Sequence, residues 1–316
     1  MISVAMATYN GEKYIRKQIE SIYKQSYPVD EVIICDDQSN DNTVKIINRF
    51  IYENHLSKKW KVVVNEKQLG FVKNFIKAIS LTTGEFVFLS DQDDIFYQNK
   101  FQVMMDFFRN NPQCILLNAN YEIIDENGRV SENFRSRSRK KRKHCVEQIE
   151  FREWLFESAF PGFSMGFRAC IREKIVNSNI EDCYGHDQLI GLIAIDQKGN
   201  YRMGDVLSGY RIHYKNTTGG INVMSNYSIS KRIEQKEKER TEYKRMENLI
   251  KKNGIQNIDY EFFSQREKEL EKRIKLLKER NLWGEVLLLF KAKTYPKGTI
   301  MGDCICLIRG DRKSVV

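Results

Sequence analysis

The sequence lacks an apolar run long enough to cross a bilayer. A membrane-spanning helix needs about 20 consecutive apolar residues, whereas the apolar run at 286–290 ends after five. The first residues also lack the basic and long apolar segments of a secretory signal peptide, and they are more typical of a buried strand. We therefore expect a cytoplasmic protein.

The sequence lacks a regular cysteine pattern, and the cysteine spacing matches no metal site. Seven cysteines, an odd number, are scattered along 316 residues, which is typical of a reducing compartment rather than of a disulfide framework. Cys304 and Cys306 are too close in sequence to form half of a zinc site. These absences argue against a disulfide-rich secreted domain and against a zinc protein.

Positive charge is concentrated in two places. The chain has a net charge of +10, and residues 225–316 hold 22 Lys and Arg against 14 Asp and Glu. Residues 135–143 (RSRSRKKRK) carry seven positive charges. Such a block usually stays solvated, and contact with anionic lipid or a lipid-linked diphosphate is the second interpretation. Because no aromatic residues interleave with the arginines, no nucleic-acid partner is expected.

Residues 1–110 alternate between strand and helix patterns. Residues 31–35 (EVIIC) are a β-branched run typical of a buried parallel strand, and residues 42–52 have the apolar spacing of a helix. Strands separated by helices predict βαβ units and a mainly parallel sheet. Farther along, strands are expected at 114–118 and 121–124, and a helix at 148–156.

Polar residues follow the predicted strands where each one ends. Examples are 8–11 (TYNG), 36–39 (DDQS) and 90–94 (SDQDD). In an open α/β sheet, ligands bind beyond the carboxyl ends of the strands. The same residue types also favour turns and helix caps, which is the alternative for any single loop. Several such loops at one edge of a sheet favour a binding site.

Three carboxylates within four residues, Asp91, Asp93 and Asp94, are the sharpest feature of these loops. They repel one another unless a cation or hydrogen-bond donors neutralise them. Oxygen ligands on a short loop suit Mg²⁺ or Mn²⁺, with substrate phosphates completing the coordination. A capped helix start is the alternative explanation.

Taken together, these segments resemble the family 2 glycosyltransferases, whose catalytic domain has the GT-A fold. The resemblance covers residues 1–220 and is closest to bacterial members described as rhamnosyltransferase-like or as builders of surface polysaccharide. The matching segments, in order, are VAMATYNGEKYI, CDDQSNDNT, NEKQLGFVKNF, LSDQDD, PGFSMGF, YGHDQLIGLIA and YRIHYKNTTG. The fold class expected is therefore a Rossmann-like α/β GT-A domain with a C-terminal helical extension.

The resemblance implies a role for particular residues. The expected donor-binding residues are Thr8, Tyr9, Asn10, Asp36, Asp37, Lys73, Asp91 and Asp93. Asp91 and Asp93 form the DxD motif and are the expected ligands of Mn²⁺ or Mg²⁺. Asp187 matches the catalytic base, although a helix N-cap explains it equally simply. His186, Arg211 and His213 match segments that contact the acceptor or close over the site.

The implied activity is an inverting, metal-dependent transfer from a UDP- or dTDP-sugar to a hydroxyl of a lipid-linked bacterial surface glycan. A metal held by a DxD loop stabilises the departing diphosphate, and a carboxylate takes the proton of the attacking hydroxyl. Two alternatives remain at this point. One is a nucleotidyltransferase, and the other is a catalytically inactive, membrane-associated scaffold.

The expected domains are a catalytic domain at 1–220 and a charged helical extension at 225–316. The catalytic domain divides into a nucleotide-sugar half, 1–110, and an acceptor half, 111–220. The extension begins with a helical hairpin that turns at Asn253 and Gly254 and packs either on the catalytic domain or on a second subunit. The second choice predicts a homodimer through the C-terminal helices. Residues 282–293 (LWGEVLLLFKAK) suit either a short helix in the headgroups of the inner leaflet or a helix docked on the catalytic domain. The first choice makes the protein peripheral on the inner face of the plasma membrane.

Overall fold

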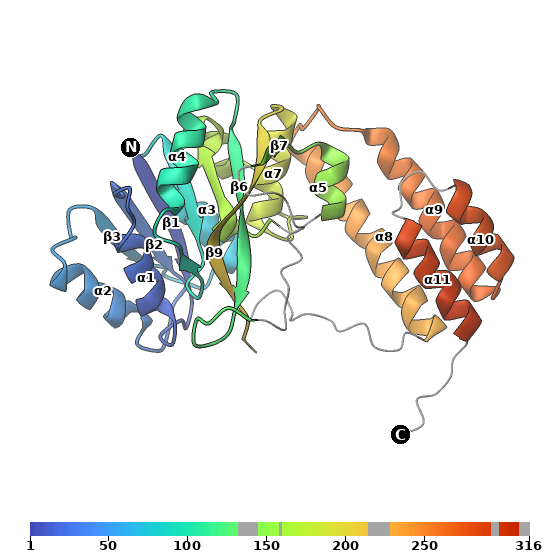
Figure 1. The fold of residues 1–316 in the computed structure, drawn as a ribbon, viewed down its shortest axis with the longest axis horizontal. Coiled ribbons are helices and arrows are strands. Elements are labelled where there is room, and N and C mark those ends of the chain that lie inside the picture. Colours follow the sequence, from blue (N-terminus) through green and yellow to red (C-terminus); the bar gives the residue numbers. More distant parts are fainter. Residues whose placement is uncertain (132–144, 158–159, 214–227, 292–296, 310–316) are drawn as a thin grey trace, which may run out of the picture. The chain divides into compact units, whose positions relative to one another are not determined.

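The chain forms two compact units in a computed structural model (Figure 1). The structure describes residues 1–131, 145–157, 160–213, 228–291 and 297–309. The first unit comprises residues 1–220 with 255–257, and the second comprises the remainder. The basic segment 135–143 lies outside the described residues.

The first unit is built on one mixed sheet. Its strands are β1 Ile2–Thr8, β2 Glu31–Asp36, β3 Trp60–Val64, β4 Phe86–Ser90, β5 Ile95–Phe96, β6 Leu116–Ile124, β7 Val146–Gln148, β8 Met165–Arg168 and β9 Asn200–Arg211. Over the described residues the order is β3-β2-β1-β4-β8-β6-β9-β5, with β7 paired to β9. The strands β1 to β4 are mutually parallel, and β8 runs antiparallel between β4 and β6. The α/β sheet predicted from the sequence is confirmed.

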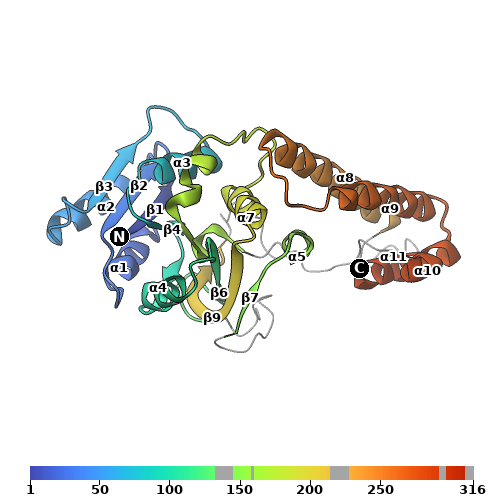
Figure 2. The ribbon, with the colours of Figure 1, turned by 90° about the horizontal axis from the view of Figure 1, so that it is seen from above.

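Helices cover both faces of this sheet (Figure 2). The helices are α1 Ile15–Tyr23, α2 Thr43–Glu53, α3 Phe71–Ser80, α4 Lys100–Asn110, α5 Phe151–Glu157, α6 Arg172–Val176 and α7 His186–Asp196. Alternate residues of β1, such as Val4 and Met6, join a core with α1, α2 and α4. The helices α3, α6 and α7 lie on the other face, where α3 contacts β1 and β2. This alternation is the period of two that a strand buried on both faces requires.

The structure corrects the bounds of two expected elements and adds one strand that the sequence did not predict. The strands expected at 114–118 and 121–124 are one strand, β6, whose register with β9 shifts around Asn120. The helix expected at 148–156 is present as α5 but begins three residues later, at Phe151, because β7 extends to Gln148. The 12-residue strand β9 had no clear sequence pattern, because Gly204, Asp205 and Ser208 interrupt its apolar residues and are buried by tertiary packing.

The second unit is a group of four helices. They are α8 Ile229–Lys252, α9 Tyr260–Lys278, α10 Leu282–Lys291 and α11 Lys297–Arg309. Each helix contacts the next, and α11 returns to contact α8. The turn between α8 and α9 contains Gly254 at φ 60°, where a glycine has no Cβ to clash. Within the described residues, no helix combines the length and the apolar character that crossing a membrane requires.

Candidate active site

The loop that follows β1 is fastened to the loop that follows β4. The Gln92 side chain accepts a hydrogen bond from the Tyr9 amide at 2.8 Å and donates one to the Tyr9 carbonyl at 2.9 Å. A Cβ on Gly11 would collide with the same Gln92 amide. The Tyr9 ring stays about half exposed, in the place expected for stacking on a base. Gln92 was missed by the sequence analysis, which treated it as the variable position of the DxD motif.

Thr8, Asn10 and Asp36 join the loop after β1 to the loop after β2 through hydrogen bonds. Asp36 is fully buried and accepts hydrogen bonds from the hydroxyls of Thr8 at 2.7 Å and Ser39 at 2.6 Å. Asn10 has a φ of 48° and accepts a hydrogen bond from the Asn40 amide at 2.9 Å. The Asp36 oxygens are therefore engaged within the protein, and this carboxylate holds the loop in shape.

Asp37 positions the start of α3. Its Oδ1 accepts hydrogen bonds from the Asn65 side chain at 2.8 Å and the Leu69 amide at 2.7 Å, and its Oδ2 accepts one from the Gly70 amide at 2.9 Å. Lys73 lies exposed in the first turn of the helix that follows. The expected donor residues Asp37 and Lys73 are thus brought to the same corner of the sheet.

The acidic loop after β4 lies near the start of α7. Burial, followed by repulsion from Asp93 and from Asp187, raises the pKa of Asp91 to about 8. Burial raises the pKa of Asp187 to about 6. Charge repulsion falls with distance. Because Asp187 raises the pKa of Asp91, these two half-buried carboxyl groups lie near each other. Carboxylates far apart in sequence therefore converge here.

Asp93 of the acidic loop and His213, which follows β9, are in contact, and both are residue types that bind metal ions. The Asp93 Oδ2 lies 2.8 Å from the His213 Nε2, and the His213 ring stacks on Tyr14 at 4.9 Å. No group of three or more His, Cys, Asp or Glu side chains in the described part of the chain is arranged to hold an ion by itself. The donors nevertheless fit a divalent cation, because such a charge would relieve the repulsion that raises the pKa of Asp91. Phosphates and water commonly complete such a site.

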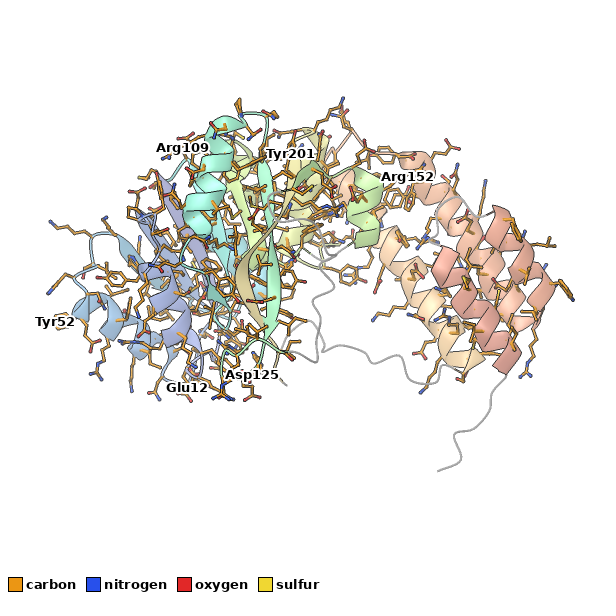
Figure 3. The ribbon with its side chains drawn as sticks, viewed as in Figure 1. Glu12, Tyr52, Arg109, Asp125, Arg152 and Tyr201 are labelled. Carbon is orange, nitrogen blue, oxygen red and sulfur yellow. The ribbon has the colours of Figure 1, made fainter. Side chains whose placement is uncertain are left out.

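Arg211 holds the acidic loop in place through hydrogen bonds. Its amide donates to Asp94 Oδ1 at 3.0 Å, and its Nε donates to the Asp93 carbonyl at 2.6 Å. Its Nη1 donates to the carbonyls of Asp125 and Glu126 at 2.8 and 2.9 Å. Figure 3 shows Asp125 at the same edge of the sheet as Glu12. Arg211 is fully buried, so its contacts stabilise the loop structure. The resemblance instead implies that this segment closes over the donor or acceptor.

Asp187 and His186 have different surroundings although they are adjacent in sequence. The helix α7 begins at His186 with Gly185 at its N-cap, so Asp187 is inside the first turn and is not the cap. The His186 ring stacks on Phe75 at 3.8 Å, and burial lowers the pKa of His186 to about 3. Within the part of the chain that the structure describes, neither ring nitrogen has a hydrogen-bond partner. His186 is therefore neutral and packed on α3.

Lys100 is the second residue that the sequence analysis missed, and it is fully buried. Its Nζ donates hydrogen bonds to the Phe163 carbonyl at 2.7 Å and the Ser208 hydroxyl at 2.8 Å. Burial lowers the pKa of Lys100 to about 7, and Asp94 partly offsets this effect. This lysine ties the PGF loop and β9 to α4, and no local sequence pattern predicts it.

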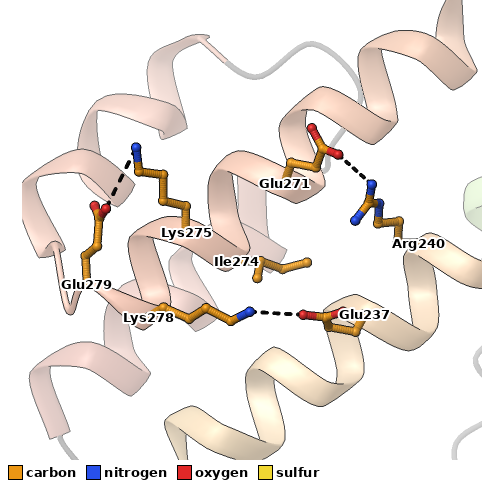
Figure 4. Close-up of a pocket in the computed structure, with 7 residues that line it drawn as sticks. All are labelled: Glu237, Arg240, Glu271, Ile274, Lys275, Lys278 and Glu279. Atoms are coloured by element: carbon orange, nitrogen blue, oxygen red, sulfur yellow. Dashed lines mark hydrogen bonds and ion pairs between the residues drawn. The ribbon is translucent and has the colours of Figure 1, made fainter.

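The second unit also has a groove (Figure 4). It has a volume of about 350 Å³ and lies between α8 and α9. Its charges are already paired, as in Arg240 with Glu271 at 2.5 Å and Lys278 with Glu237 at 3.2 Å. Exposed pairs of this kind usually stabilise a surface weakly and leave no charge for a ligand.

Comparison with known proteins points to the first unit. The family model described as "Glycosyl transferase family 2" matches residues 3–173. The chain is 32% identical over 130 residues to the UDP-Glc:alpha-D-GlcNAc-diphosphoundecaprenol beta-1,3-glucosyltransferase WfgD of Escherichia coli, covering 41% of this chain and 49% of the relative. It is 37% identical over 123 residues to the dTDP-rhamnosyl transferase RfbG of Shigella flexneri, covering 36% and 40% respectively. The chain thus spans half or less of the length of these relatives.

Two solved structures share the fold. One is S. aureus TarS 1–349 in complex with UDP-GlcNAc, with a TM-score of 0.60, 19% identity, and coverage of 98% of this chain and 89% of that one. The other is the mannosyltransferase PcManGT from Pyrobaculum calidifontis in complex with GDP-Man and Mn²⁺, with a TM-score of 0.57, 15% identity, and coverage of 98% and 80%. The α/β fold expected from the sequence is therefore the GT-A fold, and this chain belongs to glycosyl transferase family 2.

Proposed function

We propose that the chain catalyses an inverting, metal-dependent transfer of a sugar from a UDP- or dTDP-sugar to a hydroxyl of a lipid-linked surface glycan. The names of WfgD and RfbG support both the donor types and a diphosphoundecaprenol acceptor. The UDP-GlcNAc complex of TarS supports a UDP donor. The family match favours sugar transfer over nucleotidyl transfer.

One observation carries this proposal: Asp187 lies close enough to the acidic loop for its charge to raise the pKa of the half-buried Asp91. Repulsion from Asp93 and Asp187 contributes to the raised pKa of Asp91. Buried carboxylates that repel one another cost stability, and such perturbed groups cluster at functional sites. A catalytically inactive scaffold gives no reason to keep them together.

The donor end of the site follows from the loops at the sheet edge. We assign the base and ribose to Tyr9 and Asp37, and the diphosphate to the corner near Lys73. Asp91, Asp93 and His213 are the residues to hold Mn²⁺ or Mg²⁺. The metal, once bound, supplies Lewis-acid stabilisation of the charge on the departing diphosphate.

Asp187 is the proposed base. Its pKa of about 6 leaves it ionised at neutral pH and still basic enough to accept a proton from an attacking hydroxyl. One carboxylate acting from the side opposite the diphosphate inverts the anomeric configuration. The neutral His186 ring, stacked on Phe75, fixes the first turn of α7 from which Asp187 projects.

The setting of this reaction remains a prediction. All seven cysteines are free thiols, which supports a reducing, cytoplasmic compartment. We also propose a homodimer through the helical hairpin of the C-terminal extension, which is α8 and α9, and the structure of a single chain does not test it.

A screen of nucleotide sugars tests the proposed function. The full chain is incubated with Mn²⁺ and UDP-, dTDP- or GDP-sugars, with and without a diphosphoprenol-linked sugar, and the released nucleotide is identified. The proposal predicts release of UDP or dTDP that increases with the acceptor. Release of pyrophosphate instead would show nucleotidyl transfer, and no turnover with any donor would support the scaffold.

A further inference from the structure

Each of the helices α10 and α11 leaves a stripe of large apolar side chains in solvent. On α10 these are Trp283, Leu287 and Phe290, which are 78%, 59% and 81% exposed. On α11 they are Met301, Ile305 and Ile308. Each set has the spacing i, i+4, i+7, which places its three side chains on one stripe of the helix. We call these six residues the apolar face.

The opposite sides of the same helices are buried within the second unit. Leu288 on α10 and Ile300 and Cys306 on α11 are almost inaccessible, and Cys306 packs with Ile229 and Leu277. The sequence left a choice between membrane contact and docking for this region. The helices dock within their own unit through one side and leave the other side apolar, so the apolar face is not explained by that docking.

Basic residues bracket the apolar face in the sequence. The stretch 278–316 contains eight Lys and Arg and four Asp and Glu. Two of the four acids, Glu285 and Asp303, are fully buried. Arg280 precedes α10 and is exposed, and Lys278 beside it is exposed but paired with Glu237. Further basic residues follow at 291, 293, 297, 309, 312 and 313. Both ends of the helix pair therefore carry positive charge.

We propose that the apolar face docks on a lipid bilayer that contains anionic phospholipid. Exposed aromatic and aliphatic residues enter the boundary between headgroups and acyl chains, while flanking Lys and Arg attract anionic headgroups. The helices lie on the surface, since neither is long enough to span it. This surface goes beyond the transfer reaction and does not depend on which sugar or acceptor the first unit uses.

A second copy of the chain fits this face less well. In a symmetric dimer the same patch meets itself. Because the helix pair is flanked by basic residues at both ends, self-pairing would bring like charges together in either orientation, which is unfavourable. An anionic bilayer complements the same charges.

Tryptophan fluorescence gives a direct test on the full chain. The three tryptophans are Trp60 and Trp154, which are buried, and Trp283, which is exposed. Vesicles of phosphatidylcholine and phosphatidylglycerol in equal parts should shift the emission to shorter wavelength and carry the protein into the pellet. Vesicles of phosphatidylcholine alone should do so much less, and added salt should weaken the binding.

Point substitutions on the apolar face sharpen the test better than truncation, because removing α10 and α11 would expose the core of the second unit. Trp283→Gln, Phe290→Gln and Ile308→Gln together should lower vesicle binding at least tenfold, since each large apolar side chain changes partitioning by about tenfold or more. Tyr52→Gln, an equally exposed aromatic on α2, is the matched control and should bind as the parent does. Nucleotide-sugar hydrolysis should be unchanged in all variants.

Two outcomes would overturn the proposal. One is vesicle binding by the triple variant equal to that of the parent. The other is a lipid-independent dimer, seen by light scattering, that the triple variant loses, because it would make a second copy the occupant of the apolar face.

Discussion

Buried carboxylates occur in both units, but their partners differ. In the first unit, burial and mutual repulsion raise the pKa values of Asp91 and Asp94. In the second unit, Asp303 is fully buried between Arg232 and Arg273, each with a nitrogen 2.6 Å from a carboxylate oxygen. Buried acids that face one another indicate a place for a cation or a substrate, whereas buried acids that face arginines hold helices together.

Glu285 is the exception within the second unit. It lies in the same interior as Asp303, but its two carboxylate oxygens have no hydrogen-bond partner among the described residues. Burial, followed by repulsion from Asp303, raises the pKa of Glu285 to about 7. The contrast between carboxylates that face other acids and carboxylates that face arginines can therefore be tested by removing one charge of each kind.

The largest effect is expected at Asp187. Asp187→Asn removes the base and should lower transfer about 10²–10⁴-fold while donor binding, measured by calorimetry, stays unchanged. Asp106→Asn, an exposed residue of α4, is the control. The parent's rate should also fall as the pH drops below about 6, where Asp187 becomes protonated. Normal turnover by the variant would exclude Asp187 as the base.

The next effect is expected at Asp303. Asp303→Asn leaves Arg273 buried without its counter-ion, and we expect the free energy of unfolding to fall by about 3–5 kcal/mol. Urea unfolding measures this change. Glu271→Gln breaks the exposed pair with Arg240 and should cost about 1 kcal/mol or less. Equal costs for the two variants would contradict the distinction between buried and exposed pairs.

A smaller, pH-dependent effect is expected at Glu285. Because its pKa is raised from 4.5 to about 7, the folded state binds this proton more tightly than the unfolded state. The associated stability is present below pH 4.5 and is lost as the pH rises to about 7, by about 3 kcal/mol at most. Glu285→Gln should remove this dependence, so the difference in melting temperature between variant and parent should grow from pH 5 to pH 8. A constant difference would refute the shift.

The smallest effect is expected at Arg211. Arg211→Lys keeps the charge but cannot reproduce side-chain hydrogen bonds to three carbonyls, and we expect a loss of about 2 kcal/mol in the free energy of unfolding. The melting temperature without ligand measures it. An unchanged melting temperature together with weaker donor binding would instead support the closing role that the resemblance implied.

The sequence predicted the elements whose pattern is local. The alternating strands and helices of residues 1–110 and the helical hairpin around Asn253 and Gly254 have this character. The acidic loop was also visible, because three carboxylates after an apolar strand are unusual wherever they occur. Its neighbour Gln92 was not, since its partner Tyr9 lies at the end of another strand.

The parts that escaped prediction depend on contacts between distant residues. Lys100 reaches Phe163 and Ser208, and β9 is defined by its pairing with β6. The C-terminal helices show the same limit. Their apolar residues were evident from the sequence, but only the packing of Leu288 and Cys306 separates the buried side from the exposed one.

Donor binding by the acidic loop tests the central claim most directly. Titration calorimetry with UDP, in the presence and absence of Mn²⁺, compares the parent with Asp93→Asn. We predict that Mn²⁺ strengthens UDP binding to the parent by about 100-fold, which is about 2.7 kcal/mol, and that Asp93→Asn abolishes this gain. UDP affinity that is independent of Mn²⁺, or that is the same in both proteins, would contradict it.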